Sequence, residues 1–324
     1  MLPISVVMPV YNTSVSILTE AVESILHQTF REFEFIIIDD GSGTETAGYL
    51  NSLTDPRIRL IRNEKNIGVT KSLNVGFQAA QGKYIARMDA DDISLEKRLE
   101  KQYAYMEKHP DVILCGCAVE DFGERNILRF YILGNKDDYR IKCLFYYPGP
   151  PHPTMFLRRE VLVNYAISYN EELKYAQDYG LCADISICTG NVYSLTEVLL
   201  KRRFHRGRIT AQQHETQAQC SMVTQKKLLE GLLKNISDEE VSLHYRWFYD
   251  KCFHNFLDAY ECIKWCMRLI KANCHTGMYS RKKFDLFTVK LFLLVFGQSF
   301  LSSASMLITT QRIKMLIQND RMRH

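Results

Sequence analysis

A regular alternation of short apolar runs with helical patterns, over the N-terminal part of the chain, constrains the fold most strongly. Four runs typical of buried strands occupy residues 4–10, 33–38, 58–61 and 84–88. The intervals carry helical spacing, as Val15, Leu18 and Val22 do after the first run. Strands that alternate with helices form a mostly parallel sheet that is covered on both faces. We therefore expect an α/β fold with such a sheet flanked by helices.

Polar and acidic residues follow three of these runs. They are Tyr11 and Asn12 after the first, Asp39 and Asp40 after the second, and Asp89, Asp91 and Asp92 after the fourth. The carboxyl ends of parallel strands meet at one edge of a sheet, where ligands of such folds bind. We expect these groups to line one crevice. An aromatic side chain, polar groups and carboxylates together fit a nucleotide diphosphate.

The segment after the fourth run places three carboxylates within four residues. Clustered carboxylates repel one another unless they are solvated, paired or bound to a cation. Hard oxygen ligands suit Mg²⁺ or Mn²⁺, and a divalent ion at this place would hold a diphosphate. For an isolated pair of aspartates, a solvated loop with Ser94 capping the next helix would be the simpler interpretation. In this chain the alternating strands and helices that precede the three aspartates favour the metal site over the solvated loop.

Several motifs resemble those of family 2 glycosyltransferases in order and spacing. They are Pro9-Val10-Tyr11-Asn12, Asp39-Asp40-Gly41-Ser42, Asn66-Ile67-Gly68 with Lys71 to Gly76, Gly82-Lys83-Tyr84 and Asp89-Ala90-Asp91-Asp92. The resemblance is strong over residues 1 to 110 and continues more weakly to 210. It implies the A-type glycosyltransferase fold, with a Rossmann-like sheet, a nucleotide-sugar donor, a divalent metal and inversion at the anomeric carbon.

The resemblance also assigns residues to the donor site. It places Tyr11 and Asp40 around the nucleobase, which in this family is usually uracil, and includes Asn12 among the donor-binding residues. Asp89 would lie near the ribose and the metal. Asp91 would bind the ion, Mn²⁺ or Mg²⁺, that bridges the two donor phosphates. Such an ion would stabilise the charge that develops on the departing diphosphate.

The basic residues Lys71 and His152 can each be interpreted in two ways. Lys71 either contacts the nucleotide or phosphate, or is an ordinary solvated lysine on a helix. His152, in the segment Pro151-His152-Pro153, lines the donor-sugar pocket if the resemblance holds there. A histidine between two prolines is also typical of a turn.

The segment around Asp178 resembles the part of the family motif that carries the general base. A carboxylate at this place would take the proton of the acceptor hydroxyl. Gln177 replaces a common Glu and Cys182 stands where Trp is frequent, so the acceptor contacts are less certain than the base. The alternative is that Asp178 caps a helix over residues 179–187.

The run Arg202-Arg203-Phe204-His205 resembles a further family motif, with Arg202 in place of a Tyr. Arg203 would donate to the nucleotide sugar and His205 would be an additional metal ligand. A basic loop exposed to water is the alternative. Nucleic-acid binding is not expected, because no groove-reading helix or aromatic-interleaved sheet accompanies the run.

The charge distribution separates two regions. We expect a catalytic domain over residues 1–210 and a helical, basic region over residues 211–324. Residues 251–324 carry twelve Lys and Arg against four Asp and Glu, a local charge of +8, and because the whole chain carries +4, residues 1–250 carry −4. The apolar segment 284–307 is interrupted by polar residues and falls short of the ~20 apolar residues that span a bilayer.

The segment 284–307 has basic residues on both sides. It either lies on an anionic membrane surface or packs as a helix on protein. Met1-Leu2-Pro3 directly precedes the first apolar run, so we expect no signal peptide. The expected location is the cytoplasm, with ten reduced cysteines, and the inner face of the cell membrane if the surface interpretation holds.

Together these observations predict a metal-dependent inverting glycosyltransferase. The expected donor is a UDP-hexose or UDP-N-acetylhexosamine. The expected acceptor is a sugar, polyprenyl-diphosphate-linked if the chain assembles surface polysaccharide such as O-antigen or capsule. One alternative is a sugar-phosphate nucleotidyltransferase, which typically needs a Gly-rich basic loop where this chain has Tyr11-Asn12-Thr13-Ser14. The other is a nucleotide-binding scaffold without chemistry.

Overall fold

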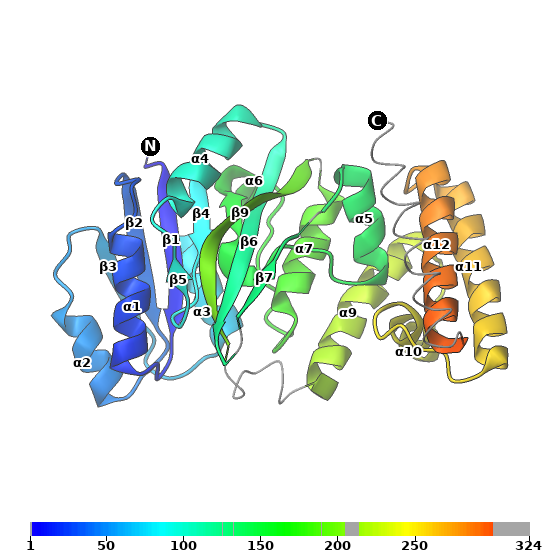
Figure 1. The fold of residues 1–324 in the computed structure, drawn as a ribbon, viewed down its shortest axis with the longest axis horizontal. Coiled ribbons are helices and arrows are strands. Elements are labelled where there is room, and N and C mark those ends of the chain that lie inside the picture. The colour runs from blue at the N-terminus through cyan, green and yellow to red at the C-terminus, as the bar shows by residue number, and fades with distance from the viewer. Residues whose placement is uncertain (1, 125, 132, 189, 205–213, 301–324) are drawn as a thin grey trace. The chain divides into compact units, whose positions relative to one another are not determined.

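The computed structural model describes residues 2–124, 126–131, 133–188, 190–204 and 214–300. The chain packs as two units (Figure 1). The first comprises Met1–Tyr139 and Pro148–Ser221, and the second comprises Arg140–Tyr147 and Met222–His324. The second unit thus includes residues 140–147. The boundary at residue 210 that is expected from the sequence places these residues in the catalytic domain.

Among the described residues, nine strands form a mixed sheet at the centre of the first unit. Its strands are β1 (Ile4–Val10), β2 (Phe33–Asp39), β3 (Ile58–Arg62), β4 (Tyr84–Arg87), β5 (Ile93–Ser94), β6 (Val112–Gly123), β7 (Ile127–Arg129), β8 (Phe156–Arg158) and β9 (Asn191–Phe204). The order is β3-β2-β1-β4-β8-β6-β9-β5, and β7 pairs with β6. Strands β1 to β4 pair in parallel as expected, whereas β8 joins β4 and β6 by antiparallel pairing. The expected α/β sheet is confirmed, and its second half is mixed.

Helices occupy the intervals between the strands and form most of the second unit (Figure 1). They are α1 (Val15–Leu26), α2 (Thr44–Ser52), α3 (Val69–Ala79), α4 (Arg98–Lys108), α5 (Lys136–Phe145), the short 3₁₀ helix η1 (His152–Thr154), α6 (Arg159–Asn164), α7 (Gln177–Ile187), α9 (His214–Leu232), α10 (Asp238–Phe248), α11 (Phe256–Thr276) and α12 (Arg281–Phe300).

The parallel strands are buried almost throughout, as expected for a sheet covered on both faces. Helix α1 buries Leu18, Val22 and Ile25 on one face, so its apolar spacing predicted its packing. Helix α3 approaches the sheet closely at Gly76. A Cβ atom there would lie 2.4 Å from Cγ1 of Val7, so this position requires glycine.

The second unit has a buried histidine at its centre. His244 on α10 donates from Nε2 to the carbonyl of Leu144 at 2.9 Å and accepts at Nδ1 from the indole N–H of Trp265 at 2.9 Å. These two bonds require the neutral imidazole. Burial accordingly lowers the pKa of His244 to about 4, from an ordinary value of 6.5.

None of the helices within the described residues is long and apolar enough to cross a bilayer. Helix α12 covers the first part of the apolar segment 284–307 and ends at Phe300. The rest of that segment lies outside the described residues.

Acidification should destabilise the second unit through His244. The stabilisation of a histidine whose folded pKa is lowered is complete above pH 6.5 and is lost as the pH falls toward 4, with a limit of about 3 kcal/mol. The measurement is urea unfolding between these pH values, followed by fluorescence of Trp247 and Trp265, the two tryptophans of the chain. His244→Gln cannot titrate, so its stability deficit relative to wild type should shrink on acidification. A deficit that is constant with pH would contradict this.

Candidate active site

The turns after β1 and β2 contact each other directly. Asn12 has a φ of 50° and accepts at Oδ1 from the backbone N–H of Gly43 at 2.8 Å. Its own N–H donates to the hydroxyl of Ser42 at 3.1 Å. Tyr11, the neighbour of Asn12, is 51% exposed. The strand ends therefore converge as the parallel sheet predicts, and the ring of Tyr11 remains available for stacking.

Asp40 organises the turn that leads into α3. Its carboxylate accepts from the backbone N–H groups of Ile67 and Gly68, both at 2.9 Å, and from the side-chain amide of Asn63 at 2.8 Å. A carboxylate offers about four acceptor positions, so this buried side chain retains capacity for a ligand. The nucleobase contact remains a prediction. Lys71 is exposed on α3.

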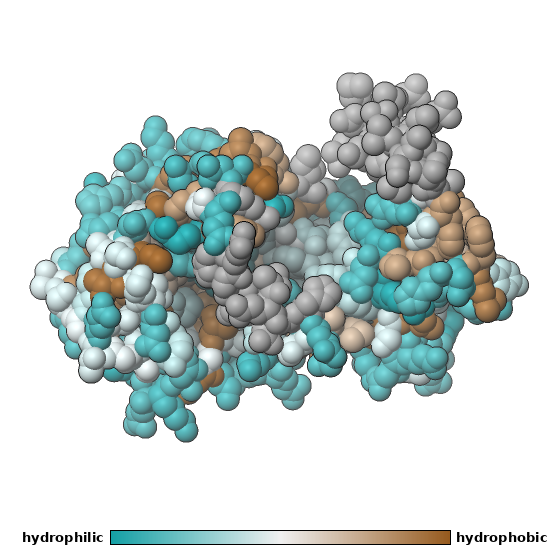
Figure 2. Space-filling model, turned by 60° about the horizontal axis from the view of Figure 1, so that its bottom comes forward, coloured by the Kyte–Doolittle hydropathy of each residue, from teal (hydrophilic) through white to brown (hydrophobic). Residues whose placement is uncertain are grey.

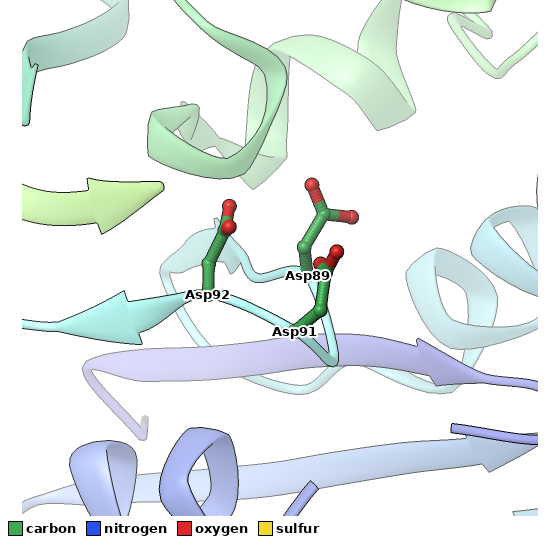
Figure 3. Close-up of side chains that lie close together, drawn as sticks. All are labelled: Asp89, Asp91 and Asp92. Atoms are coloured by element: carbon green, nitrogen blue, oxygen red, sulfur yellow. The ribbon is translucent and has the colours of Figure 1, made fainter. Parts of the chain in front are cut away.

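The three aspartates after β4 form one acidic cluster. One carboxylate oxygen from each of Asp89, Asp91 and Asp92 lies within 4.8 Å of the others. Figure 3 shows the three side chains rising from the same side of the turn. Asp92 is 1% exposed, and within the described part of the chain its Oδ2 has no hydrogen-bond partner. Burial first, and then the charges of Asp89 and Asp91, raise the pKa of Asp92 well above its ordinary value.

A buried arginine lies behind this cluster. Arg87 is 3% exposed at the end of β4, and its Nη2 contacts the carboxylate of Asp89 at 2.5 Å. Its Nε and Nη1 are buried and have no hydrogen-bond partner among the described residues. Arg98 donates to the backbone carbonyl of Arg87 at 2.7 Å and thus fixes the strand end. The sequence prediction gave Arg87 no role, although a charge within an apolar strand signals one.

The donor set fits a hard divalent cation. Three carboxylates converge, and no hydrogen-bond donor among the described residues reaches the buried Oδ2 of Asp92. Mg²⁺ and Mn²⁺ prefer such oxygen ligands and leave room for phosphate oxygens. Asp91, the expected ligand, belongs to this cluster. His205, the other expected ligand, lies outside the described residues.

Arg203 contacts the acidic turn from β9. Its backbone N–H donates to Oδ1 of Asp92 at 2.8 Å, and its Nε donates to the backbone carbonyl of Asp91 at 3.0 Å. Its Nη2 reaches Glu20 at 2.6 Å, and its guanidinium lies 4.6 Å from the centre of the Phe122 ring. Arg203 therefore belongs to the site, where it braces the aspartates. A contact from Arg203 to the donor remains a prediction.

His152 lies in η1 and pairs with a buried tyrosine. Its Nε2 is 2.7 Å from the hydroxyl of Tyr169. Burial, followed by the charge of Arg87, lowers the pKa of His152 well below its ordinary value, so its ring is neutral. The structure thus shows the turn and adds a partner, Tyr169, that the sequence prediction did not identify.

Asp178 is the second residue of α7. The residue at the N-cap position is Ala176, with a φ of 52°, so Asp178 does not cap this helix. Its Oδ1 accepts from the backbone N–H of Tyr179 at 2.9 Å. Burial raises the pKa of Asp178, the charge of Asp89 raises it further, and the charge of Arg87 lowers it. Asp178 therefore interacts electrostatically with Asp89 of the acidic cluster.

Known proteins resemble this chain in sequence and in fold. Residues 5–165 match the family model described as Glycosyl transferase family 2. An uncharacterized glycosyltransferase of Methanocaldococcus jannaschii is 38% identical over 208 residues, which cover 62% of this chain and 70% of that protein. The amylovoran biosynthesis glycosyltransferase AmsE of Erwinia amylovora is 34% identical over 196 residues, which cover 57% of this chain and 70% of that protein.

Solved structures agree at the level of the fold. S. aureus TarS 1–349 in complex with UDP-GlcNAc has a TM-score of 0.60 at 17% identity, with 93% of each chain covered. The mannosyltransferase PcManGT from Pyrobaculum calidifontis in complex with GDP-Man and Mn²⁺ has a TM-score of 0.58 at 14% identity, with 90% of this chain and 85% of that chain covered. The fold and the relatives define a glycosyltransferase. This chain belongs to glycosyltransferase family 2.

The acidic cluster yields a direct prediction. Asp91→Ala should lower release of the nucleoside diphosphate from the nucleotide sugar by at least about 10²-fold, because it removes a ligand of the cation that would stabilise the negative charge developing on the leaving diphosphate. The half-exposed position of Asp91 should leave thermal unfolding nearly unchanged. EDTA should reproduce the loss in the wild-type protein.

Glu96→Ala is the matched control, because Glu96 is an exposed carboxylate close to the cluster in sequence. It should keep the wild-type rate. Normal turnover of Asp91→Ala, or of the EDTA-treated enzyme, would show that the proposed metal role is wrong.

Proposed function

We propose that this chain transfers a hexose or N-acetylhexosamine from a UDP-sugar to a carbohydrate acceptor with inversion. The acidic cluster of Asp89, Asp91 and Asp92 carries this proposal, together with the electrostatic interaction between Asp89 and Asp178. The UDP-GlcNAc complex of TarS supports a uridine donor, and the Mn²⁺ in the PcManGT complex supports a divalent ion. We propose Mn²⁺ or Mg²⁺ for this chain.

The donor would lie across the ends of β1, β2 and β4. The exposed ring of Tyr11 would stack on the base, and Asp40 would use its remaining acceptor capacity for the base. Asp89 and Asp91 would hold the ion beside the diphosphate, with Lys71, Asn12 and His152 as further donor contacts. The bound cation would supply Lewis acidity toward the diphosphate leaving group.

Asp178 would act on the acceptor. As the acceptor oxygen forms its bond to the anomeric carbon, the bond from that carbon to the diphosphate oxygen breaks and UDP departs. The hydroxyl proton moves to the carboxylate of Asp178. Attack opposite the leaving group converts an α-linked donor into a β-glycoside. Burial raises the pKa of Asp178 and so makes its carboxylate a stronger base.

The proposed setting is surface polysaccharide assembly. AmsE, a relative at 34% identity, is named for amylovoran biosynthesis, which supports a polysaccharide pathway. We extend this to a sugar acceptor linked to polyprenyl diphosphate, in O-antigen or capsule synthesis at the cytoplasmic face of the membrane.

The role of Asp178 is tested by Asp178→Asn, which keeps size and polarity but removes basicity. UDP-GlcNAc, UDP-glucose and GDP-mannose with Mn²⁺ are first screened for protection against thermal unfolding, because a ligand of the folded state raises apparent stability. With the donor that protects, Asp178→Asn should bind as wild type in calorimetry and turn over at least about 10²-fold more slowly.

Separate outcomes would contradict separate parts of this account. Unchanged turnover of Asp178→Asn would show that another group takes the proton. Lost donor affinity would make Asp178 a binding residue. Protection by GDP-mannose without protection by a UDP-sugar would show that the uridine assignment is wrong.

We also propose that the second unit contacts an anionic membrane surface. Helices α11 and α12, side by side in Figure 1, expose large apolar side chains. These are Phe256, Leu257, Tyr260, Ile263 and Met267 on α11, and Leu286, Val289 and Leu293 on α12. Figure 2 shows hydrophobic surface on this unit. Exposed Lys271, Arg281 and Lys282 add positive charge that suits anionic headgroups.

Replacing Phe256 and Met267 by Asp should lower co-flotation with anionic phospholipid vesicles, because the two side chains are 68% and 65% exposed and would otherwise enter the interface. Val163→Asp is the matched control, since Val163 is 63% exposed on the first unit. High salt should weaken the wild-type association because it screens charge. Equal flotation of the Phe256/Met267 variant and wild type would favour packing on protein instead.

A further inference from the structure

We propose that Asn74 and Thr70 on α3 are positioning residues, which place Asp178 by holding the loop of residues 165–176 that leads into α7. This inference rests on the proposed role of Asp178 as the base. The contacts that carry it lie within the first unit and join residues that are 95 and 103 positions apart in the sequence.

Residues 167–176 of the loop lie outside helices and strands, so buried backbone groups there need partners other than a helix or sheet ladder. Asn74 supplies two of them. Its Oδ1 accepts from the backbone N–H of Tyr169 at 2.9 Å, and its Nδ2 donates to the backbone carbonyl of Tyr169 at 2.9 Å. The same Nδ2 reaches the carboxylate of Glu171 at 3.1 Å. One side-chain amide therefore satisfies both backbone groups of a loop residue.

Two more residues of α3 contact the same loop. The hydroxyl of Thr70 donates to the backbone carbonyl of Leu173 at 3.0 Å, and the ring of Phe77 lies 5.1 Å from the ring of Tyr169. Positions 70, 74 and 77 share one face of a helix. Tyr169 and Leu173 are almost fully buried. The face of α3 thus fixes the loop at two buried points rather than at one.

The second of these points is close to the base. Leu173 precedes Asp178 by five residues, and the chain between them turns through the left-handed conformation of Ala176 before α7 begins. A shift of the loop would therefore move Asp178 relative to the donor. A displacement of about 1 Å at a reacting group is enough to lower a rate about 10²-fold.

The N-terminal end of α3 also meets the donor side. The N–H of Gly68, which directly precedes the helix, donates to the carboxylate of Asp40 at 2.9 Å. One helix therefore contacts the carboxylate assigned to the nucleobase and the loop that carries the base. Helix α3 thus links the acceptor side of the proposed site to its donor side.

The test compares Asn74→Asp with a matched control. Asp keeps the shape of Asn74 and accepts from the N–H of Tyr169, but it does not donate to the carbonyl. Asn273 on α11 makes the same pair of bonds to the backbone of Tyr279, at 2.9 and 3.2 Å, and is likewise buried. Asn273→Asp therefore removes an equivalent clamp in the second unit, without any link to Asp178.

UDP release from UDP-GlcNAc with Mn²⁺, with water as the acceptor, is the probe of turnover. Asn74→Asp should lower kcat between about 10- and 100-fold while the KM for UDP-GlcNAc changes by less than about threefold. Asn273→Asp should keep both values. Hydrogen exchange of the peptide 169–178 should accelerate in Asn74→Asp and stay unchanged in Asn273→Asp. Thr70→Val should share the kcat loss, and Thr70→Ser, which retains the hydroxyl, should restore it.

A double variant separates positioning from general destabilisation. If Asn74 acts through Asp178, Asn74→Asp combined with Asp178→Asn should be no slower than Asp178→Asn alone. The inference would be overturned if the double variant showed the product of the two single losses in kcat. A normal kcat for Asn74→Asp, or an equal loss of kcat in Asn273→Asp, would also overturn it. A normal rate for Asp178→Asn alone would instead overturn the proposed base, so the two failures are distinguishable.

Discussion

Mutual repulsion within the acidic cluster is the constraint on which the rest of the site depends. Three carboxylate oxygens within 4.8 Å of one another cannot remain charged in a partly buried place without opposing charge. The protein supplies part of that charge with Arg87, which is buried against Asp89. Arg203 holds the same turn through its backbone N–H, which donates to Asp92, and its Nε, which donates to the backbone carbonyl of Asp91. The remaining deficit is what a divalent cation would neutralise.

The strand order explains why this charge gathers where a nucleotide sugar can use it. Parallel pairing of β1 with β2 and β4 brings three turns to one edge, and side-chain bonds tie the turns after β1 and β2 to each other. Asn12 holds the Ser42–Gly43 turn, and Asp40 holds the turn before α3. The residues proposed to bind the donor therefore also hold the loops that carry them, an arrangement that pre-organises a site.

Much of this arrangement was predictable from the sequence because it follows from local pattern. Apolar runs and the spacing of Leu18 and Val22 predicted the parallel strands and α1, and family motifs predicted a glycosyltransferase. The antiparallel insertion of β8 was not predictable, since Phe156–Arg158 is too short to show a period. The structural roles of Arg87 and Asn74 were also missed, because their partners lie in distant segments or are defined only by burial.

The same reasoning explains why the sequence singles out Asp178 as a candidate base but not the residues that hold the loop before it. A carboxylate in a recognisable motif can be identified from sequence, whereas the partners of Tyr169 are the side chain of Asn74 and the ring of His152. Such contacts are non-local and depend on the tertiary fold. In this enzyme short sequence motifs contain the candidate catalytic and metal-binding residues. Buried side chains from other parts of the sequence fix the positions of those residues.

The proposed function depends most directly on a cation that the acidic cluster would bind and that would hold the donor diphosphate. Crystals grown with UDP and Mn²⁺, measured near the manganese absorption edge, test it most directly. The account predicts an anomalous peak between the carboxylate of Asp91 and both phosphates of UDP, and the loss of that peak in Asp91→Ala. Bound UDP with no anomalous peak beside Asp89, Asp91 or Asp92, or with manganese at another place, would contradict it.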